Sequence, residues 1–127
     1  MPSLRATVEV ISSRTSASTC DASSSGIMQV RLLRLDSAAS PRVLAAFTLD
    51  ADGRHPGGPL LDAAAMAAGR YRLVFAVAPY FRARGVTLPE PPFIDEVQLD
   101  FGIADAAGHY HVPLLVSPWS YSTYRGS

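Results

Sequence analysis

Short runs of alternating apolar and polar residues, separated by turn-forming residues, limit most strongly how this chain can fold. The clearest run spans residues 70–78, where every second side chain, from Tyr71 to Val77, is large and apolar. Alternation with a period of two is typical of a strand with one buried face. Further strands are predicted at residues 4–11, 28–35, 43–49, 96–103 and 110–117. Many short strands, spaced this regularly by turn residues, predict an all-β fold, an antiparallel β-sandwich.

Between the strands, the sequence predicts one short helix and several loops. Residues 79–85 begin with proline and end with glycine, which is typical of a single helical turn. Residues 61–68 are rich in alanine and leave two interpretations open: two helical turns, or a loop that follows a short strand at residues 59–61. Residues 12–26 are mostly serine, threonine and alanine without an apolar period, so they indicate a loop or a poorly ordered segment.

Length, hydrophobicity and charge predict one compact domain without a membrane or nucleic-acid partner. Its 127 residues can bury a core without a disulfide or a metal, so residues 1–127 are predicted to form a single domain. No run approaches the roughly 20 apolar residues that cross a bilayer, and no membrane partner is expected. The eleven basic residues, all arginine, balance eleven acidic ones, which argues against a nucleic-acid partner.

Cysteine and histidine usage limits the compartment and the cofactors. The single Cys20 cannot form an internal disulfide, and no basic and apolar leader precedes the domain, so a cytoplasmic location is expected. The three histidines lack cysteine or carboxylate neighbours at ligand spacing. We therefore predict no metal site and no cofactor.

The last part of the chain concentrates the side chains that can do chemistry. Residues 108–127 hold two of the three histidines, the only tryptophan and three of the five tyrosines. His111 and Ser117 fall on one face of the predicted strand, and Pro113 between them indicates that one edge of this strand is unpaired or bulged. Residues 119–127 are expected to dock on the body of the domain, because frayed ends rarely carry so many aromatic residues.

Six stretches of the sequence match one family. They are Asp52-Gly53-Arg54, Gly58-Pro59-Leu60-Leu61, Tyr80-Phe81-Arg82, Pro91-Pro92-Phe93, the segment from His109 to Leu115, and the terminal Tyr124-Arg125-Gly126-Ser127. Together they make residues 28–127 resemble the 5-hydroxyisourate hydrolases, the enzymatic branch of the transthyretin-like proteins. The terminal Tyr-Arg-Gly-Ser is highly specific to that branch, whereas Pro-Pro-Phe alone would mean little.

The resemblance implies a fold, an assembly and an activity. The fold would be a transthyretin-like antiparallel β-sandwich of two four-stranded sheets with one short helix. The assembly would be a homotetramer, with active sites in a channel between dimers. The reaction would be hydrolysis of 5-hydroxyisourate, a small purine-derived molecule, to 2-oxo-4-hydroxy-4-carboxy-5-ureidoimidazoline in urate breakdown.

The same chemistry can be assigned to individual side chains. Opening a cyclic amide with water needs a base that takes a proton from the water, and donors that stabilise the oxyanion. Histidine suits the first role and arginine the second, so we predict His111 and Arg54 as catalytic residues. The terminal residues are predicted to bind substrate: Tyr124, Arg125, Gly126 and Ser127. Outside the family motifs, His111 would be interpreted as a partly buried structural histidine and Arg54 as a solvated turn residue.

One segment departs from the family pattern. The resemblance implies a Thr-His-Val-Leu-Asp segment in the first strand, with a catalytic histidine. Counting back from Met28 without gaps places this histidine on Thr15, within the divergent residues 12–26, and no histidine precedes His55. We therefore expect hydrolysis that is weak but not zero. The alternative is a non-catalytic transthyretin-like protein that binds a planar aromatic ligand in the channel between subunits.

Overall fold

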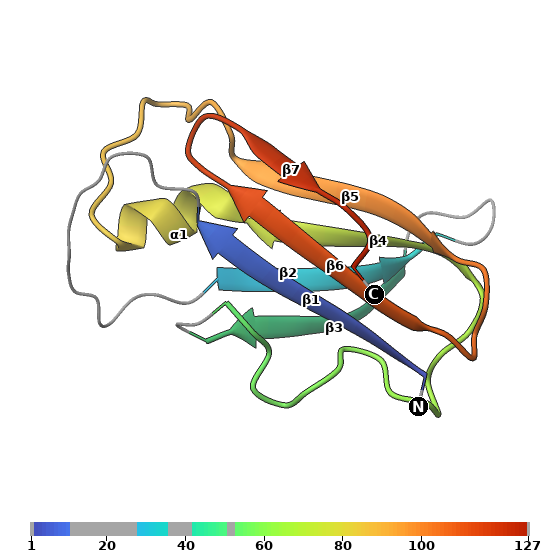
Figure 1. Cartoon of the computed structure of the whole chain (residues 1–127). Coiled ribbons are helices and arrows are strands. Elements are labelled where there is room, and N and C mark those ends of the chain that lie inside the picture. Colours follow the sequence, from blue (N-terminus) through green and yellow to red (C-terminus); the bar gives the residue numbers. More distant parts are fainter. Residues whose placement is uncertain (1, 11–27, 36–41, 51–52, 127) are drawn as a thin grey trace.

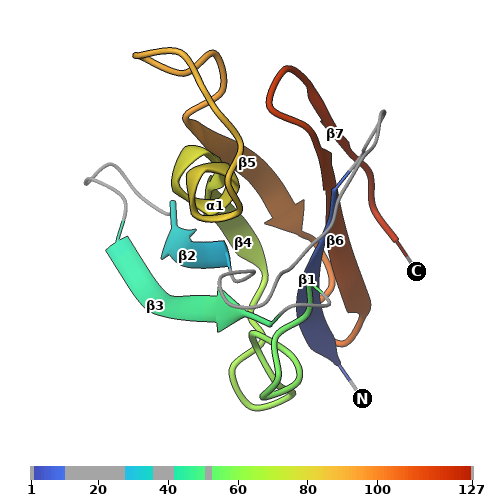
Figure 2. The same ribbon diagram turned by 90° about the vertical axis from the view of Figure 1, so that its left-hand side faces the viewer.

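Two β-sheets packed face to face make up the protein (Figure 1). The computed structural model describes residues 2–10, 28–35, 42–50 and 53–126. One sheet has the order β1-β6-β7 and consists of β1 (Ser3–Val10), β6 (His109–Val116) and β7 (Tyr121–Thr123). The other has the order β3-β2-β4-β5 and consists of β3 (Arg42–Leu49), β2 (Met28–Arg34), β4 (Gly69–Ala76) and β5 (Glu96–Ile103). Figure 2 shows the molecule turned by 90°, so that the two sheets are seen as separate layers.

The predicted elements are confirmed to within two residues at each end. Helix α1 (Val77–Ala83) starts two residues before the predicted turn, directly after β4. Pro79 therefore falls inside the first helical turn, where its missing N–H costs no hydrogen bond. The loop predicted at residues 12–26 lies outside the described residues. Within the described residues, no helix is long and apolar enough to cross a membrane.

The sheet that contains β1 differs from the prediction in two ways. Among the described residues it has three strands and not four, and β1 pairs with β6 in parallel and not antiparallel. Where a fourth strand would lie, two isolated antiparallel bridges contact β1, one from Arg54 to Thr7 and one from Leu61 to Leu4. The glycines and prolines between these bridges favour turns over a continuous ladder. The bridge at Leu61 supports the second interpretation of residues 61–68, a loop after a short strand-like contact.

A close approach of two backbones holds the first bridge in place. Gly53 has a φ of +79°, and a Cβ atom there would lie 2.1 Å from the carbonyl oxygen of Val8. The Val8 N–H donates to the Gly53 carbonyl at 2.9 Å. Only glycine fits a left-handed position this close to another backbone. The turn therefore fixes the following residue, Arg54, against the edge of β1.

The core lies between the two sheets, where the predicted alternation places it. The inward residues of β4, Tyr71, Leu73 and Phe75, are at most 1% exposed. Fully burying a side chain of this size contributes roughly 1.5–3 kcal/mol to folding. The opposite sheet contributes the inward residues of β1 and β6, which include Leu4 and Leu114. Their alternation fixes which side chains of these two strands point out of the sandwich.

Pro113 lies in the central strand of its sheet, and the predicted unpaired edge of this strand is found on the side of β7. It is in register with Thr7 of β1, and on the other side β7 pairs only with residues 114–116. The β6–β7 ladder then breaks and resumes as one bridge between His111 and Gly126. Because Pro113 has no N–H to donate, the ladder breaks beside it. The Thr123 hydroxyl donates to the Pro113 carbonyl at 2.8 Å across this break.

Candidate active site

The outward face of the three-stranded sheet presents the candidate site. Leu4 and Ala6 of β1 are buried, so Arg5 and Thr7 point away from the core. On the neighbouring strand β6, His111 lies between two buried residues and points the same way. β1 and β6 run side by side through the middle of the view in Figure 1. The strand alternation therefore gathers an arginine, a threonine and a histidine on one surface.

The imidazole of His111 is held between two neighbours. Its Nε2 lies 2.8 Å from the hydroxyl oxygen of Thr7. On the other side of the ring, a Cβ atom added to Gly126 would lie 2.6 Å from Nδ1, so the main chain of Gly126 passes close to this nitrogen. The Gly126 N–H donates to the His111 carbonyl at 2.7 Å, which fixes the two segments together. The ring is thus positioned by one hydroxyl and one stretch of main chain.

The surroundings of His111 favour its neutral form. Partial burial lowers the pKa of the imidazole below its ordinary value, because desolvation disfavours the charged form. The positive charge of Arg5, the residue in register with His111 on β1, lowers the pKa further. A neutral imidazole near pH 7 can accept a proton.

Arg54 reaches the same face from the far side of β1. In its antiparallel bridge to Thr7, the paired residues project to the same side of the sheet. The backbone of Arg54 is fixed by Asp50, whose carboxylate accepts from the Arg54 N–H at 3.1 Å and whose own N–H donates to the Arg54 carbonyl at 2.7 Å. No hydrogen bond or ion pair joins the guanidinium to another described residue. Its charge therefore remains available to an anion or an oxyanion.

The C-terminal segment docks along β6 up to residue 126, as predicted, but its side chains lie on different sides of that strand. Gly126 contacts His111, whereas the guanidinium of Arg125 lies 4.3 Å from the ring centre of Tyr110 and donates to the His109 carbonyl at 3.0 Å. Tyr110 is a core-facing residue, so Arg125 lies on the opposite side of the strand from His111. Tyr124 is 60% exposed. Ser127 lies outside the described residues.

The residue of the first strand that contacts His111 is Thr7. The gapless count placed the family's first-strand histidine on Thr15, which lies outside the described residues. β1 supplies Thr7 at hydrogen-bond distance from His111, within a strand that the sequence had predicted. Sequence reasoning missed Thr7 as a site residue. The available signal was its position beside Arg5 on the polar face of that strand.

The two other histidines contact groups outside the candidate site. His55 lies in the turn, where its Nδ1 is 3.0 Å from the Gly58 carbonyl oxygen and its ring packs edge-on against Phe47. His109 lies at the start of β6, with Nδ1 3.4 Å from the Ser3 hydroxyl. Within the part of the chain that the structure describes, no group of three or more His, Cys, Asp or Glu residues could hold a metal ion.

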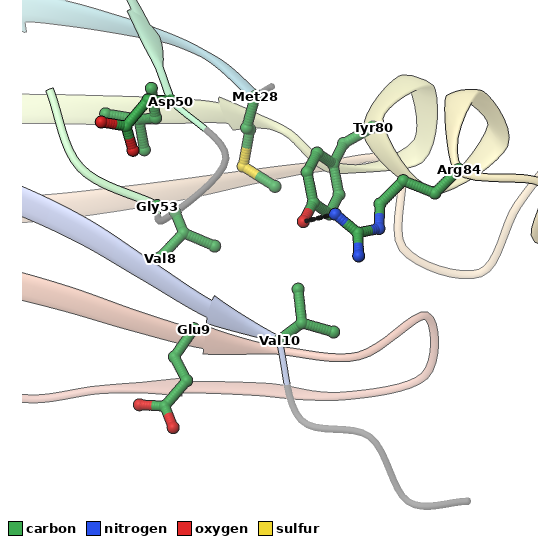
Figure 3. A pocket seen from close by; sticks show the side chains of 9 residues that line it. Val8, Glu9, Val10, Met28, Asp50, Gly53, Tyr80 and Arg84 are labelled. Carbon is green, nitrogen blue, oxygen red and sulfur yellow. Dashed lines mark hydrogen bonds between the residues drawn. The ribbon is translucent and has the colours of Figure 1, made fainter. Parts of the chain in front are cut away.

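A separate hollow of about 230 Å³ lies at the end of β1, next to α1 (Figure 3). Arg84 donates to the Tyr80 hydroxyl at 2.9 Å, and burial raises the pKa of this tyrosine against the opposing charge of Arg84. The hollow is lined on the β1 side by Val8 and Val10, whereas Glu9 points away from the tyrosine. Among the described residues that line it there is no histidine, whereas the outward face presents His111 together with Arg54, so that face is the better catalytic candidate.

Known proteins of one family resemble this chain in sequence and in fold. The model of a family described as HIUase/Transthyretin matches residues 17–126. A 5-hydroxyisourate hydrolase of Ralstonia nicotianae is 66% identical over 76 residues, which are 60% of this chain and 64% of that protein. The 5-hydroxyisourate hydrolase 2 of Rhizobium meliloti is 51% identical over 100 residues, which are 79% of this chain and 82% of that protein. The match to the Ralstonia protein therefore spans just under two thirds of its length.

A solved structure extends the likeness to the whole chain. The 5-hydroxyisourate hydrolase of Klebsiella pneumoniae superposes with a TM-score of 0.67 at 28% identity, over all of both chains. This likeness includes the first strand, which the family model does not reach.

Proposed function

This chain belongs to the HIUase/Transthyretin family, and we propose that it hydrolyses 5-hydroxyisourate. Water opens the cyclic amide C–N bond, and the product is 2-oxo-4-hydroxy-4-carboxy-5-ureidoimidazoline. The names of the most similar relatives support this substrate. The observation that carries the proposal is His111, a partly buried imidazole whose pKa is lowered by burial and by the charge of Arg5, on a face that also presents Arg54.

Each residue of this face has a role that follows from its chemistry. The oxygen of a water molecule bonds to the ring carbonyl carbon while the proton that it loses is accepted by His111 as the base. The negative charge that develops on the carbonyl oxygen is stabilised by the guanidinium of Arg54. As the C–N bond breaks, the leaving nitrogen takes the proton from the imidazolium, which returns His111 to its neutral form. Of the terminal residues predicted to bind substrate, Gly126 lies against His111 on this face, whereas Arg125 lies on the other side of the strand.

The assembly proposed for this function is a homotetramer in which further copies cover the site. The His111 face is the outer surface of a sheet, and a substrate bound there would lie open to water in a single copy. Large aromatic side chains are also exposed on the single copy; they are Phe93, Trp119, Tyr121 and Tyr124. Exposed aromatic residues in this number support an interface. A location in the cytoplasm stays a prediction from the sequence.

The test of the proposed function is the decay of freshly generated 5-hydroxyisourate, followed by absorbance. The full chain should accelerate this decay over buffer alone. His111→Ala removes the proton acceptor and should lower kcat/KM by about 10²–10⁴. The matched control is His55→Ala, which removes a histidine of the turn and should change the rate little. If the parent chain leaves the decay at the rate of buffer, the hydrolase is ruled out and the non-catalytic alternative gains support.

A further inference from the structure

Thr7 contacts the imidazole of His111 on the outward face of the sheet. Its hydroxyl oxygen is 2.8 Å from Nε2, well inside hydrogen-bond range. The main chain of Gly126 passes close to the other ring nitrogen, Nδ1. The Thr7 hydroxyl therefore occupies the hydrogen-bonding position on Nε2, so a water that gives its proton to this nitrogen must displace the hydroxyl or pass the proton through it.

The backbone of Thr7 is fixed on both sides. In β1 it is in register with Pro113 of β6, and across the other edge it forms the bridge with Arg54. Threonine is branched at Cβ and has few side-chain rotamers in a strand. Thr7 can thus hold its hydroxyl on Nε2 at a small entropic cost. A hydroxyl is both donor and acceptor, so it can give its proton to Nε2 while accepting one from a water.

We propose that Thr7 is a catalytic residue that relays the proton of the attacking water to His111. This inference rests on the proposed function. The water oxygen bonds to the carbonyl carbon, the water proton moves to the Thr7 oxygen, and the Thr7 proton moves to Nε2. When the C–N bond breaks, the leaving nitrogen receives one proton back along the same path. Thr7 ends the cycle unchanged, and no bond forms between Thr7 and the substrate.

The bridge between Thr7 and Arg54 brings the two residues to the same edge of the sheet. Because the two residues are paired across the edge of β1, their side chains leave adjoining backbones on the same side of the sheet. A water held by the Thr7 hydroxyl can then attack a carbonyl whose oxygen lies toward Arg54. One bridge would place the nucleophile and the charge that stabilises the oxyanion on the same carbonyl group.

The experiment compares three variants of the full chain on 5-hydroxyisourate. Thr7→Val keeps the branched shape and removes the hydroxyl, and it should lower kcat by about 10²–10⁴ with little change in KM. Thr7→Ser keeps a hydroxyl and should recover most of this loss. Thr48→Val makes the same change on the exposed side of β3 in the other sheet and should match the parent. Equal rates for Thr7→Val and the parent would overturn the relay, as would a Thr7→Ser variant as slow as Thr7→Val.

Two further measurements separate the relay from other roles of Thr7. Imidazole ¹⁵N NMR of the parent should report Nδ1 as the protonated nitrogen of neutral His111, since Nε2 accepts from Thr7; an Nε2–H tautomer would overturn the relay. Mass spectrometry of protein quenched during turnover should find the unmodified chain. A covalent adduct on Thr7 would make it a nucleophile and also overturn the relay.

The outcomes also separate this inference from the proposed function. A parent chain that fails to accelerate the decay overturns the hydrolase, and the relay with it. An active parent that loses rate on His111→Ala but not on Thr7→Val leaves the hydrolase standing and removes only the relay. Thermal unfolding of Thr7→Val confirms that the variant is folded, because valine suits a strand as well as threonine does.

Discussion

The protonation state of one residue, His111, controls whether the site can act as a base. Two features of its surroundings lower its pKa, partial burial first and the charge of Arg5 second. Its ordinary pKa is about 6.5. At neutral pH most of the imidazole is therefore neutral and able to accept a proton. Activity should rise with pH through the lowered pKa of His111 and level off above it.

Replacing Arg5 with glutamine should move this pH dependence. Without the neighbouring positive charge, the charged imidazole is less disfavoured, so the pKa of His111 rises. The ascending limb of kcat/KM should then shift to higher pH, and activity at acidic pH should fall relative to the parent. The measurement is a pH profile of kcat/KM on 5-hydroxyisourate. Arg70→Gln, an exposed arginine of the other sheet, is the control and should leave the profile in place.

The same shift affects stability in a defined direction. The unfolded chain binds a proton at His111 more readily than the folded chain, because the folded-state pKa is lowered. The stability contributed by neutral His111 is therefore complete above about pH 6.5 and is lost as the pH falls toward the lowered value. In Arg5→Gln, where the folded-state pKa lies closer to the ordinary one, less stability should be lost over this range.

Individual strands could be predicted from the sequence, but their partners could not. A period of two identifies the buried face of β4 and places His111 on the polar face of β6. It says nothing about which strand lies next to which, so the parallel pairing of β1 with β6 and the Thr7–His111 contact were missed. The three exposed residues of β7 have no buried face and so give no alternation to detect. The gapless count to Thr15 assumed a spacing before Met28 that strand patterns cannot supply.

The edge contact between the turn at Gly53 and β1 should be sensitive to a single methyl group. Gly53→Ala places a Cβ atom within 2.1 Å of the Val8 carbonyl oxygen and also strains a φ of +79°. We expect a loss of about 1–3 kcal/mol from the strain and more from the clash, together with lower activity because Arg54 moves from the edge. Thermal unfolding and kcat/KM measure the two effects. Gly58→Ala is the control, since it has a similar φ of +95° but no atom within 4 Å. Equal losses in both variants would contradict a role for the close approach.

For the whole molecule, the proposal is that the site is completed by assembly. Light scattering at micromolar concentration should give four times the chain mass of 13.5 kDa. If neighbouring copies exclude water from the His111 face, the rate per chain should fall when the protein is diluted until subunits separate. Gel filtration at the same dilutions checks that the loss follows dissociation. A monomer mass with a full rate per chain would contradict this prediction.

Thr7 and His111 are 104 positions apart in the sequence, although their side chains lie 2.8 Å apart. The contact between them depends on β1 pairing with a strand that is synthesised long after it. Closing so long a loop costs entropy before any pairing energy is gained, and folds with many such distant pairings fold slowly. β1 must therefore stay unpaired, with its sheet edge exposed, until β6 has formed. In the antiparallel pairs β2–β3 and β4–β5, by contrast, each strand pairs with the next strand in the sequence. After dilution from denaturant, we therefore expect these two pairs to form before the enzymatic rate recovers.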